Sequence, residues 1–359
     1  MLITLPITVR NSAPLGYWLT PVVADCLARQ ISEQTIVYYG ALGKRASSSH
    51  ELSLFKQNLQ QLGVKARIKS DEEEAGLIDL VDSVVEKLGV TDSSQLCYVC
   101  ECGSLELPVS IATYAKQKTF SREGEDYVCK ACGQKGKKTH ARKQSLVIPE
   151  KLDPNQVAVY PAWYAPEVKE VVRQLNAQGY TVFRDRETGI NRTGRQIDVE
   201  FAWSLLPLVL SLHNRGERVR IVITNHVLRQ AIAAMIIAAA INPSFQGDVI
   251  VLPCIEHPGN TAKWNLERLF QLGYTGELLR LMLISSLGWS KKDVPLLESL
   301  RDIEHRRITL LKKHIAALSA KQFELSAAIR NLNREDILLG IKRVFNPELF
   351  DYSTLMGLL

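Results

Sequence analysis

Two short clusters of cysteines, each ending in glycine, constrain this chain more than any other feature. The first reads Cys97-Tyr-Val-Cys100-Glu-Cys102-Gly103, and the second reads Tyr127-Val-Cys129-Lys-Ala-Cys132-Gly133. Two thiolates on one tight turn can reach the same metal ion, and a glycine after the second cysteine permits that turn. Two such turns supply four sulfurs, the number that a tetrahedral zinc site requires. The pattern predicts a pair of zinc knuckles.

The likeness of the two clusters indicates which thiols are ligands. The stretch from Tyr98 to Gly103 equals the second cluster with one residue removed, which favours the ligand set Cys100, Cys102, Cys129 and Cys132 for Zn²⁺. Cys97 in place of Cys100 would restore the usual two-residue gap and stays open as an alternative. Buried thiols without a metal are a further interpretation, and a disulfide would require an oxidising compartment. His140 is a weaker candidate, because four cysteines already fill the site.

Length and charge set broad limits on the function. A chain of 359 residues predicts about two domains, or one large domain with an insertion. The net charge of +6 permits a nucleic-acid partner without requiring one. The N-terminus has no basic region or cleavage site, so the seven cysteines favour a reducing, cytoplasmic environment. The most apolar run, 231–241, is shorter than the ~20 residues of a membrane span and predicts a buried helix.

The first quarter of the chain has the pattern of a nucleotide-binding α/β unit. A strand is expected over 2–9, a turn rich in small residues over 11–20, and a helix over 21–30. Such a helix N-terminus presents free amide groups to an anion. An ordinary turn between a strand and a helix is the alternative. Farther along, the acidic run 71–74 precedes a helix over 77–88 and is expected to complement its positive N-terminus.

The second half of the chain repeats the α/β alternation. We expect a single long helix over 199–213 after a charged loop over 184–196. Apolar strands are expected over 219–224 and 249–252, typical of a buried parallel sheet. His226 and His257 follow these strands, at the sheet edge where binding residues gather.

These features predict an α/β protein, a Rossmann-like parallel sheet with a zinc-ribbon insertion and a C-terminal helical bundle. The expected division is 1–92 for the first half of the sheet domain, 93–145 for the insertion, 146–262 for the second half and 263–359 for the helical region. The basic run from Lys135 to Lys143 is interpreted either as a contact with a phosphate backbone or as a solvated loop.

The order of these elements resembles the core of the class I aminoacyl-tRNA synthetases. The stretch 6–19 is similar to the segment that carries the His-Ile-Gly-His signature, and 55–64 to the helix before the inserted connective domain. The cysteine clusters resemble that insertion in the methionyl and class I lysyl enzymes. Residues 222–226, Val-Ile-Thr-Asn-His, stand where the family has a Gly-x-Asp-His turn. The stretch 267–285 resembles the one after the Lys-Met-Ser-Lys-Ser loop.

The resemblance implies a nucleotide or an aminoacyl-adenylate bound in the Rossmann cleft, with ATP and Mg²⁺ as cofactors and tRNA or another RNA as partner. On the phosphate side it implies four residues: Asn11, Pro14, Gly16 and Trp18. Thr224, Asn225 and His226 would contact the ribose or the base.

The sequence also departs from the family pattern. Neither signature histidine is present near Gly16, and the lysine loop is replaced by the stretch 256–263, in which His257 and Lys263 would substitute as catalytic groups. Compared with the family, this chain would therefore present less positive charge to the phosphate groups that react. Three functions stay open: ATP-dependent activation of an amino acid, a non-catalytic zinc module that binds RNA or a protein partner, and another nucleotide-dependent enzyme. The tail over 295–345 is expected to form a shortened helical domain.

Overall fold

A computed structural model describes residues 1–7, 9, 13–30, 34–40, 49–101, 105–106, 120–129, 132–148, 156–184, 190–192, 194–213, 218–256, 265–271, 276, 279–280, 283 and 294–295. Most of the expected C-terminal helical region falls outside these residues. Of the expected helical region, Gly276, Leu279, Arg280 and Leu283 are described and are helical. Within the described part of the chain, no helix is long and apolar enough to cross a membrane.

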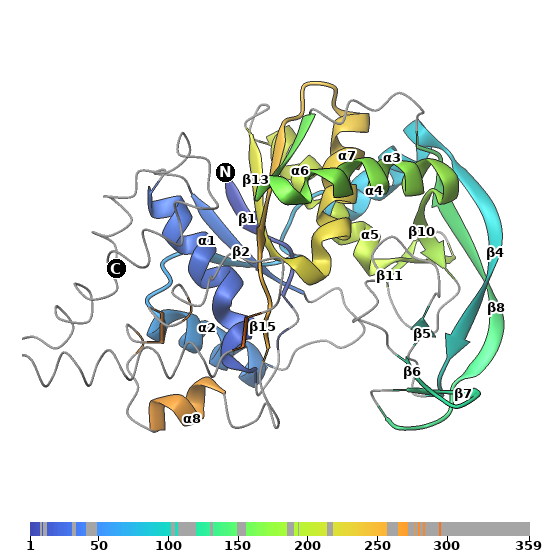
Figure 1. Cartoon of the computed structure of the whole chain (residues 1–359). Helices are drawn as coiled ribbons and strands as arrows, with labels where there is room; N and C mark the ends of the chain where they lie inside the picture. The colour runs from blue at the N-terminus through green and yellow to red at the C-terminus, as the bar shows by residue number, and fades with distance from the viewer. Residues whose placement is uncertain are drawn as a thin grey trace, which may run out of the picture.

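The main sheet has six strands, all parallel, and confirms the predicted fold class (Figure 1). Its strands follow the spatial order β3 (Arg67–Ser70), β2 (Thr35–Tyr39), β1 (Leu2–Thr4), β13 (Val219–Thr224), β14 (Gly247–Leu252) and β9 (Val157–Tyr160). β1 and β13 are neighbours although more than half of the chain lies between them. The first half of the chain therefore extends the sheet from β1 to one edge, and the second half begins at the opposite edge with β9 before it returns to β13. The two halves meet at β1 and β13, as in Rossmann folds.

Alternating side chains divide the sheet between two hydrophobic cores. Val222 packs into one core, while its neighbours Ile221 and Ile223 pack into the other. This alternation follows from the two-residue period of a strand. Both faces are buried because both carry helices, which explains why these strands are apolar at nearly every position.

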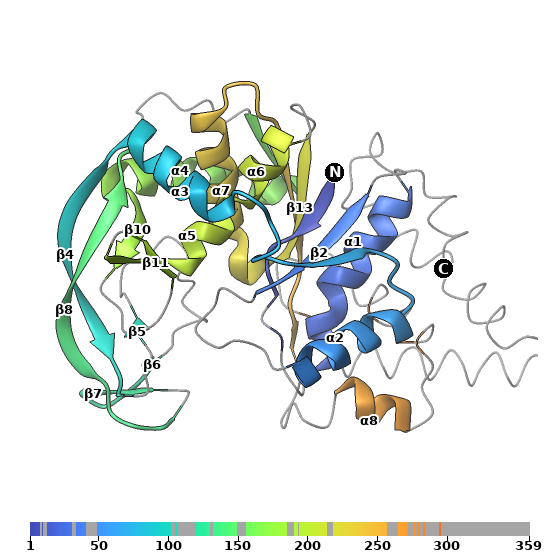
Figure 2. The ribbon, with the colours of Figure 1, turned by 180° about the vertical axis from the view of Figure 1, so that it is seen from behind.

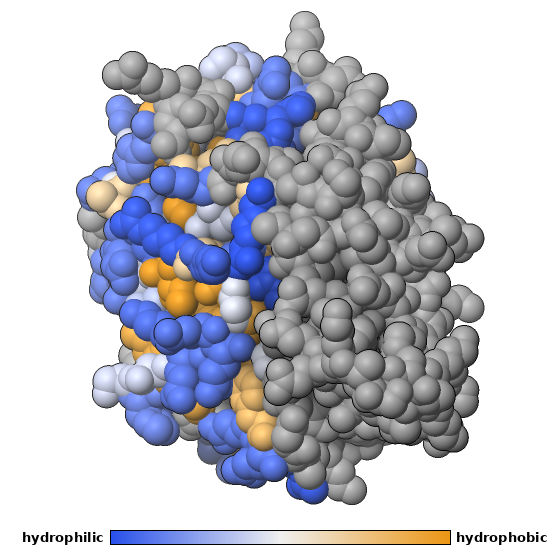
Figure 3. Space-filling view, turned by 90° about the vertical axis from the view of Figure 1, so that its left-hand side faces the viewer, coloured by the Kyte–Doolittle hydropathy of each residue, from blue (hydrophilic) through white to orange (hydrophobic). Residues whose placement is uncertain are grey.

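The helices form two layers on the sheet, visible on its two sides in Figures 1 and 2. The first layer is formed by η1 (Leu15–Trp18), α1 (Leu19–Gln30), α2 (Ser49–Gln61) and α8 (Leu266–Gln271). The second is formed by α3 (Leu77–Leu88), α4 (Ala165–Gln178), α5 (Val199–Ser204), α6 (Leu206–His213) and α7 (Leu228–Ile241). The expected buried helix is confirmed in α7, whose residues from Ala231 to Ala239 are all buried. Figure 3 faces the side of α1 and α2, where polar side chains surround smaller apolar areas.

A second sheet, antiparallel throughout, carries the first cysteine cluster at the end of β4. Its strand order is β11 (Ile190–Arg192), β12 (Arg195–Ile197), β10 (Tyr180–Arg184), β8 (Lys137–Leu146), β4 (Val90–Val99) and β5 (Leu105–Glu106). β4 and β8 form a long curved ribbon that leaves the core beside α3. Near its far end lies the hairpin of β6 (Phe120–Glu123) and β7 (Asp126–Cys129). In both views that end of the ribbon lies towards the bottom of the molecule, as do α8 and β15 (Ile255–Glu256), although α8 is on the opposite side.

Two local predictions of secondary structure were wrong. The expected single helix over 199–213 is two helices, α5 and α6, separated at Leu205. Pro207 explains the break, because it has no amide hydrogen to donate to the carbonyl four residues earlier. The expected loop over 184–196 contains β11 and β12, which extend the second sheet. Their strand character comes from the pairing of β12 with β10 and of β11 with β12, which the charged sequence does not reveal.

The acidic run at 71–74 does not serve the helix that follows it. α3 begins after Gly76, and no side chain caps its first turn. Asp71 is instead fully buried and accepts a 2.6 Å hydrogen bond from Trp203 Nε1. Glu74, also buried, accepts a 2.6 Å bond from the Tyr38 hydroxyl and a 2.7 Å bond from Lys69 Nζ. These carboxylates tie β2, β3 and α5 together, which replaces the expected role of complementing the helix N-terminus.

Candidate functional site

The two halves of the sheet meet between β1 and β13, and the helices that follow these strands, α1 and α7, lie on opposite faces of the sheet. Leu2, Ile3 and Thr4 pair in parallel with Arg220, Ile221 and Val222. Ligands of open α/β sheets bind outside the carboxyl ends of the strands at such a switch point. A ligand site is therefore expected at the segments that follow β1 and β13.

On the β1 side, the chain enters the short helix η1 before α1. Pro14 precedes η1 in an extended conformation, and its carbonyl accepts a 2.9 Å hydrogen bond from the Tyr17 amide. Pro14 also forms an isolated bridge with Asn265, and Gly16 is half-buried. Trp18 is 2% exposed and packs on Phe55, with ring centroids 5.4 Å apart. Trp18 is therefore a core residue, and its packing on Phe55 fixes the end of η1 to the core. Asn11 lies outside the described residues.

On the β13 side, the chain enters a second short helix, η5 (Asn225–Val227). Thr224 ends β13 in an extended conformation and precedes η5. Thr224, Asn225 and His226 are all half-buried. The structure thus brings the candidates from both strands to the same edge of the sheet. The strand-end rule predicted this position for His226, and the resemblance to the class I synthetases implied the other candidates.

Two further side chains follow strands of this edge and did not stand out in the sequence. Trp163 lies in η4 (Ala162–Tyr164), directly after β9, and packs against the same core as Trp18. Its indole nitrogen is buried without a hydrogen-bond partner among the described residues. Cys254 follows β14 and is half-buried. The strand-end rule could have identified both. The predicted catalytic residues His257 and Lys263 lie outside the described residues and stay predictions.

The second candidate site is a cluster of three thiols at the end of the ribbon. Cys100, Cys129 and Cys132 bring their sulfur atoms within 4.8 Å of one another. The Sγ atoms of Cys100 and Cys132 are 3.3 Å apart. Four sulfurs at about 2.3 Å from zinc in a tetrahedron would be about 3.8 Å apart. The spacing and the soft sulfur donors therefore fit a metal ion of this kind.

The turn after Cys129 has the geometry that the sequence predicted. Gly133 has a φ of +75°, which only glycine adopts without strain. The Gly133 amide donates to the Cys129 carbonyl over 2.8 Å, and the Cys129 amide donates to the Gln134 carbonyl over 2.8 Å. Cys132 is thereby returned towards Cys129. The equivalent turn after Cys100 contains Cys102, which lies outside the described residues.

The structure separates Cys97 from this thiol cluster. Cys97 lies within β4, opposite Thr139 of β8, and is fully buried. Cys100 lies just past the end of β4, and its sulfur belongs to the three-thiol group while that of Cys97 does not. The register that counts Cys100 as a metal-site residue is the one the geometry favours.

A basic strip follows one face of β8. We define it as Lys138, His140 and Arg142, which are exposed and alternate along the strand, so that they share a face. Tyr98 of β4 pairs with Lys138 on that face and stacks on Tyr127 with centroids 3.8 Å apart. The ammonium group of Lys138 lies 5.5 Å from the Tyr127 ring centroid. Cations interleaved with stacked aromatic rings are typical of surfaces that bind nucleic acid.

The face of β8 that carries the basic strip is buried at the base of the ribbon and exposed farther along the strand. At the base of the ribbon the same face carries Leu146, which pairs with Tyr180 of β10, and both are buried in the core of the second helix layer. Figures 1 and 2 place the far end of the ribbon at the same end of the molecule as β15, which follows β14. The far end of the ribbon and the carboxyl edge of the sheet therefore lie at the same end of the molecule.

The comparisons with known proteins agree with this architecture. No protein-family model and no curated protein matches the sequence. Among solved structures, the chain is similar to methionyl-tRNA synthetase of Mycobacterium tuberculosis bound to methionyl-adenylate, with 9% identity over 99% of this chain and 79% of that one and a TM-score of 0.58. The ligand-free form of the same enzyme is matched over 77% of its length with a TM-score of 0.54 and 9% identity. The chain thus has the fold of a class I aminoacyl-tRNA synthetase core, with sequence motifs that have diverged from the family signatures.

Proposed function

We propose that this synthetase-like protein binds a nucleotide or an aminoacyl-adenylate at the carboxyl edge between β1 and β13. The observation that carries the proposal is the convergence of η1 and η5 on the switch point of the sheet. The similar mycobacterial enzyme holds methionyl-adenylate in the same kind of fold.

Each candidate residue has a role that its position supports. The backbone around Pro14 and Gly16 would approach the phosphates, since this turn precedes α1 and carries no bulky side chain at Gly16. Thr224, Asn225 and His226 would bind the ribose or the base through hydroxyl, amide and imidazole groups. Trp18 would hold η1 from the core.

Activation of an amino acid with ATP and Mg²⁺ is the further step of this proposal. His257 and Lys263 would supply positive charge to the phosphates in place of the family lysines. Asn11 would complete the phosphate side. Phosphoryl chemistry depends mainly on positioning and on stabilising charge, so a weaker positive field predicts slow activation.

Calorimetric titration with ATP and with a series of aminoacyl-sulfamoyl adenosines tests the binding proposal. His226→Ala should weaken binding about tenfold, the equivalent of one hydrogen bond of about 1.4 kcal/mol. His140→Ala, an exposed histidine on β8, is the matched control and should leave the affinity unchanged. If neither ATP nor any adenylate analogue binds at millimolar concentration, the proposal is wrong. Pyrophosphate exchange then separates binding from activation.

We also propose that the thiol cluster holds one Zn²⁺, with Cys102 joining Cys100, Cys129 and Cys132. A four-thiolate zinc site leaves no position for water or substrate, so the metal would be structural. The apolar cluster beside it consists of few buried side chains, chiefly Tyr98 and Phe120. So small a core needs an additional cross-link to be stable.

A second candidate function, binding of tRNA or another RNA, is supported by the basic strip and the Tyr98–Tyr127 stack. Phosphate contacts from Lys138 and Arg142 would provide affinity that does not depend on sequence. The strip would act with the adenylate site, or alone in a non-catalytic module. Stable association with a protein and no affinity for RNA would instead favour a scaffold.

A further inference from the structure

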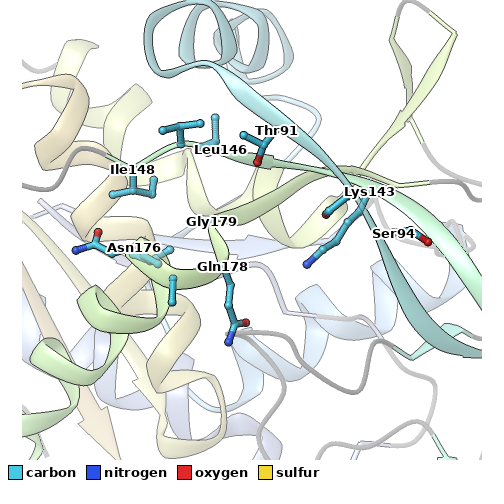
Figure 4. A pocket seen from close by; sticks show the side chains of 12 residues that line it. Thr91, Ser94, Lys143, Leu146, Ile148, Asn176, Gln178 and Gly179 are labelled. Atoms are coloured by element: carbon cyan, nitrogen blue, oxygen red, sulfur yellow. The ribbon is translucent and has the colours of Figure 1, made fainter.

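A pocket lies at the root of the ribbon, where β4 and β8 leave the main body. It has a volume of about 580 Å³, within the range of sites for small molecules. The start of β4, the end of β8 and the last turn of α4 enclose it (Figure 4). Helices of this fold run antiparallel to the strands, so the end of α4 lies at the amino edge of the main sheet. The pocket is therefore separate from the proposed nucleotide site.

One wall of the pocket is polar. Thr91 and Ser93 lie on the face of β4 opposite to the basic strip, and Lys143 pairs with Ser93 on that face. Figure 4 shows the half-buried Lys143 with its amino group extending into the pocket. Hydroxyl groups beside an ammonium group form a donor surface suited to a carboxylate or a phosphate.

A buried hydroxyl adjoins this wall. Ser145 pairs with Thr91, is 2% exposed, and has no hydrogen-bond partner for its Oγ among the described residues. A buried hydroxyl of this kind calls for an explanation, because leaving it unsatisfied costs about 1–3 kcal/mol. A bound ligand or its water at the neighbouring Thr91 would supply a partner.

The opposite wall has the reverse polarity. α4 ends at Gln178, and the last carbonyl groups of a helix have no partner within it. They carry the partial negative charge of the helix C-terminus, which attracts hydrogen-bond donors and cations. Between the two walls lie the apolar side chains of Leu146, Ile148 and Leu175.

We propose that the root pocket binds a small organic anion that carries hydrogen-bond donors at its other end. The acidic group would lie against Lys143 and Ser93, the donors against the last turn of α4, and the carbon skeleton against Leu146 and Ile148. A free amino acid and a sugar phosphate share this chemistry. The volume accommodates either.

The test uses the full-length protein and titrates it calorimetrically with the twenty amino acids, with ribose 5-phosphate and glucose 6-phosphate, and with inorganic phosphate. At least one organic anion should bind with submillimolar Kd. The substitution Lys143→Met should weaken binding of that anion at least tenfold. Lys137→Met is the matched control, because it lies on the same strand and face but outside the pocket, and it should change Kd less than twofold.

Ala177→Trp provides a second variant that is independent of charge. Ala177 lines the pocket from an exposed position on α4, so a large side chain there should block the ligand without disturbing the core. It should weaken binding at least tenfold. The amino-acid and sugar-phosphate titrations identify the source of the anion. The proposal is overturned if no organic anion binds, if inorganic phosphate binds equally well, or if Ala177→Trp binds as the wild type does.

Discussion

Arg280 donates a 3.0 Å hydrogen bond to the Asp25 carboxylate, joining two residues that are 255 positions apart. Both side chains are buried. The same guanidinium group donates to the Gly63 carbonyl over 2.9 Å. On the same segment, a Cβ on Gly276 would lie 1.7 Å from the Gln61 carbonyl oxygen, so the backbone there touches the end of α2. The Arg280 segment is therefore fixed onto α1 and α2.

Replacing Arg280 with Met should reduce the free energy of unfolding by about 3 kcal/mol, because it leaves the Asp25 carboxylate buried with one partner fewer. Urea unfolding followed by tryptophan fluorescence measures the change. Arg268→Met, at an exposed position of α8, is the control and should cost less than about 0.5 kcal/mol. Equal effects of the two variants would show that Arg280 does not anchor its segment.

Gly179→Ala should destabilise the protein more than Gly124→Ala. The two glycines have nearly the same backbone angle, with φ of +64° and +63°. A Cβ on Gly179 would lie 2.4 Å from the Leu146 carbonyl oxygen, whereas one on Gly124 meets nothing within 4 Å. The left-handed backbone conformation disfavours alanine and should reduce the free energy of unfolding by about 1 kcal/mol in both variants. The clash should reduce it by about 2 kcal/mol more in Gly179→Ala. Thermal unfolding of both variants checks the difference, which should vanish if the α4–β10 turn can shift away.

The metal content of cysteine variants tests the zinc proposal and its register. Cys129→Ser should lose the metal, while Cys97→Ser should keep one Zn²⁺ per chain, since Cys97 is not part of the thiol cluster. Elemental analysis of the purified variants measures this. Loss of zinc in both variants would restore Cys97 as a ligand. Removal of zinc by a chelator should expose the amides of β6 and β7 to hydrogen exchange and leave those of β13 protected.

Substitutions in the basic strip should weaken RNA binding without regard to sequence. Lys138→Ala and Arg142→Ala should each reduce the slope of log affinity against log salt by about one unit in filter binding with tRNA. Lys137→Ala lies on the other face of β8 and serves as the control. A loss of affinity as large in Lys137→Ala would show that the ribbon attracts RNA by its overall charge and not by this face.

Tyr38 should make the protein sensitive to alkali. Burial, with the hydrogen bond to Glu74 as a second cause, raises the pKa of Tyr38 far above its usual value of about 10. The folded state therefore holds the hydroxyl proton of Tyr38 more tightly than the unfolded state does. This difference contributes fully to the free energy of unfolding below about pH 10, and the contribution is lost as the pH rises above 10. Urea unfolding between pH 8 and 11 should show that the free energy of unfolding falls less steeply with pH in Tyr38→Phe than in the wild type. Identical declines would assign the alkaline sensitivity to other groups.

The sequence by itself determined the local features of this protein. Strand and helix periods predicted the parallel sheet and the buried helix α7, because these patterns depend on neighbouring residues. The glycine after Cys132 predicted the tight turn, because only glycine adopts the angle found at Gly133 without strain. The strand-end rule predicted that His226 lies at the carboxyl edge of the sheet, and η5 places it there.

Only the tertiary structure decided how distant segments meet. The choice between Cys97 and Cys100 depended on where β4 ends, which its pairing with β8 sets. The assignment of Trp18 to the core depended on Phe55 in another helix. In the acidic run 71–74, Asp71 accepts a hydrogen bond from Trp203 and Glu74 accepts one from Tyr38, and no side chain of the run caps a helix. In each case the partner is remote in sequence, and a local pattern records which residues favour burial or turns but not which remote side chain they contact.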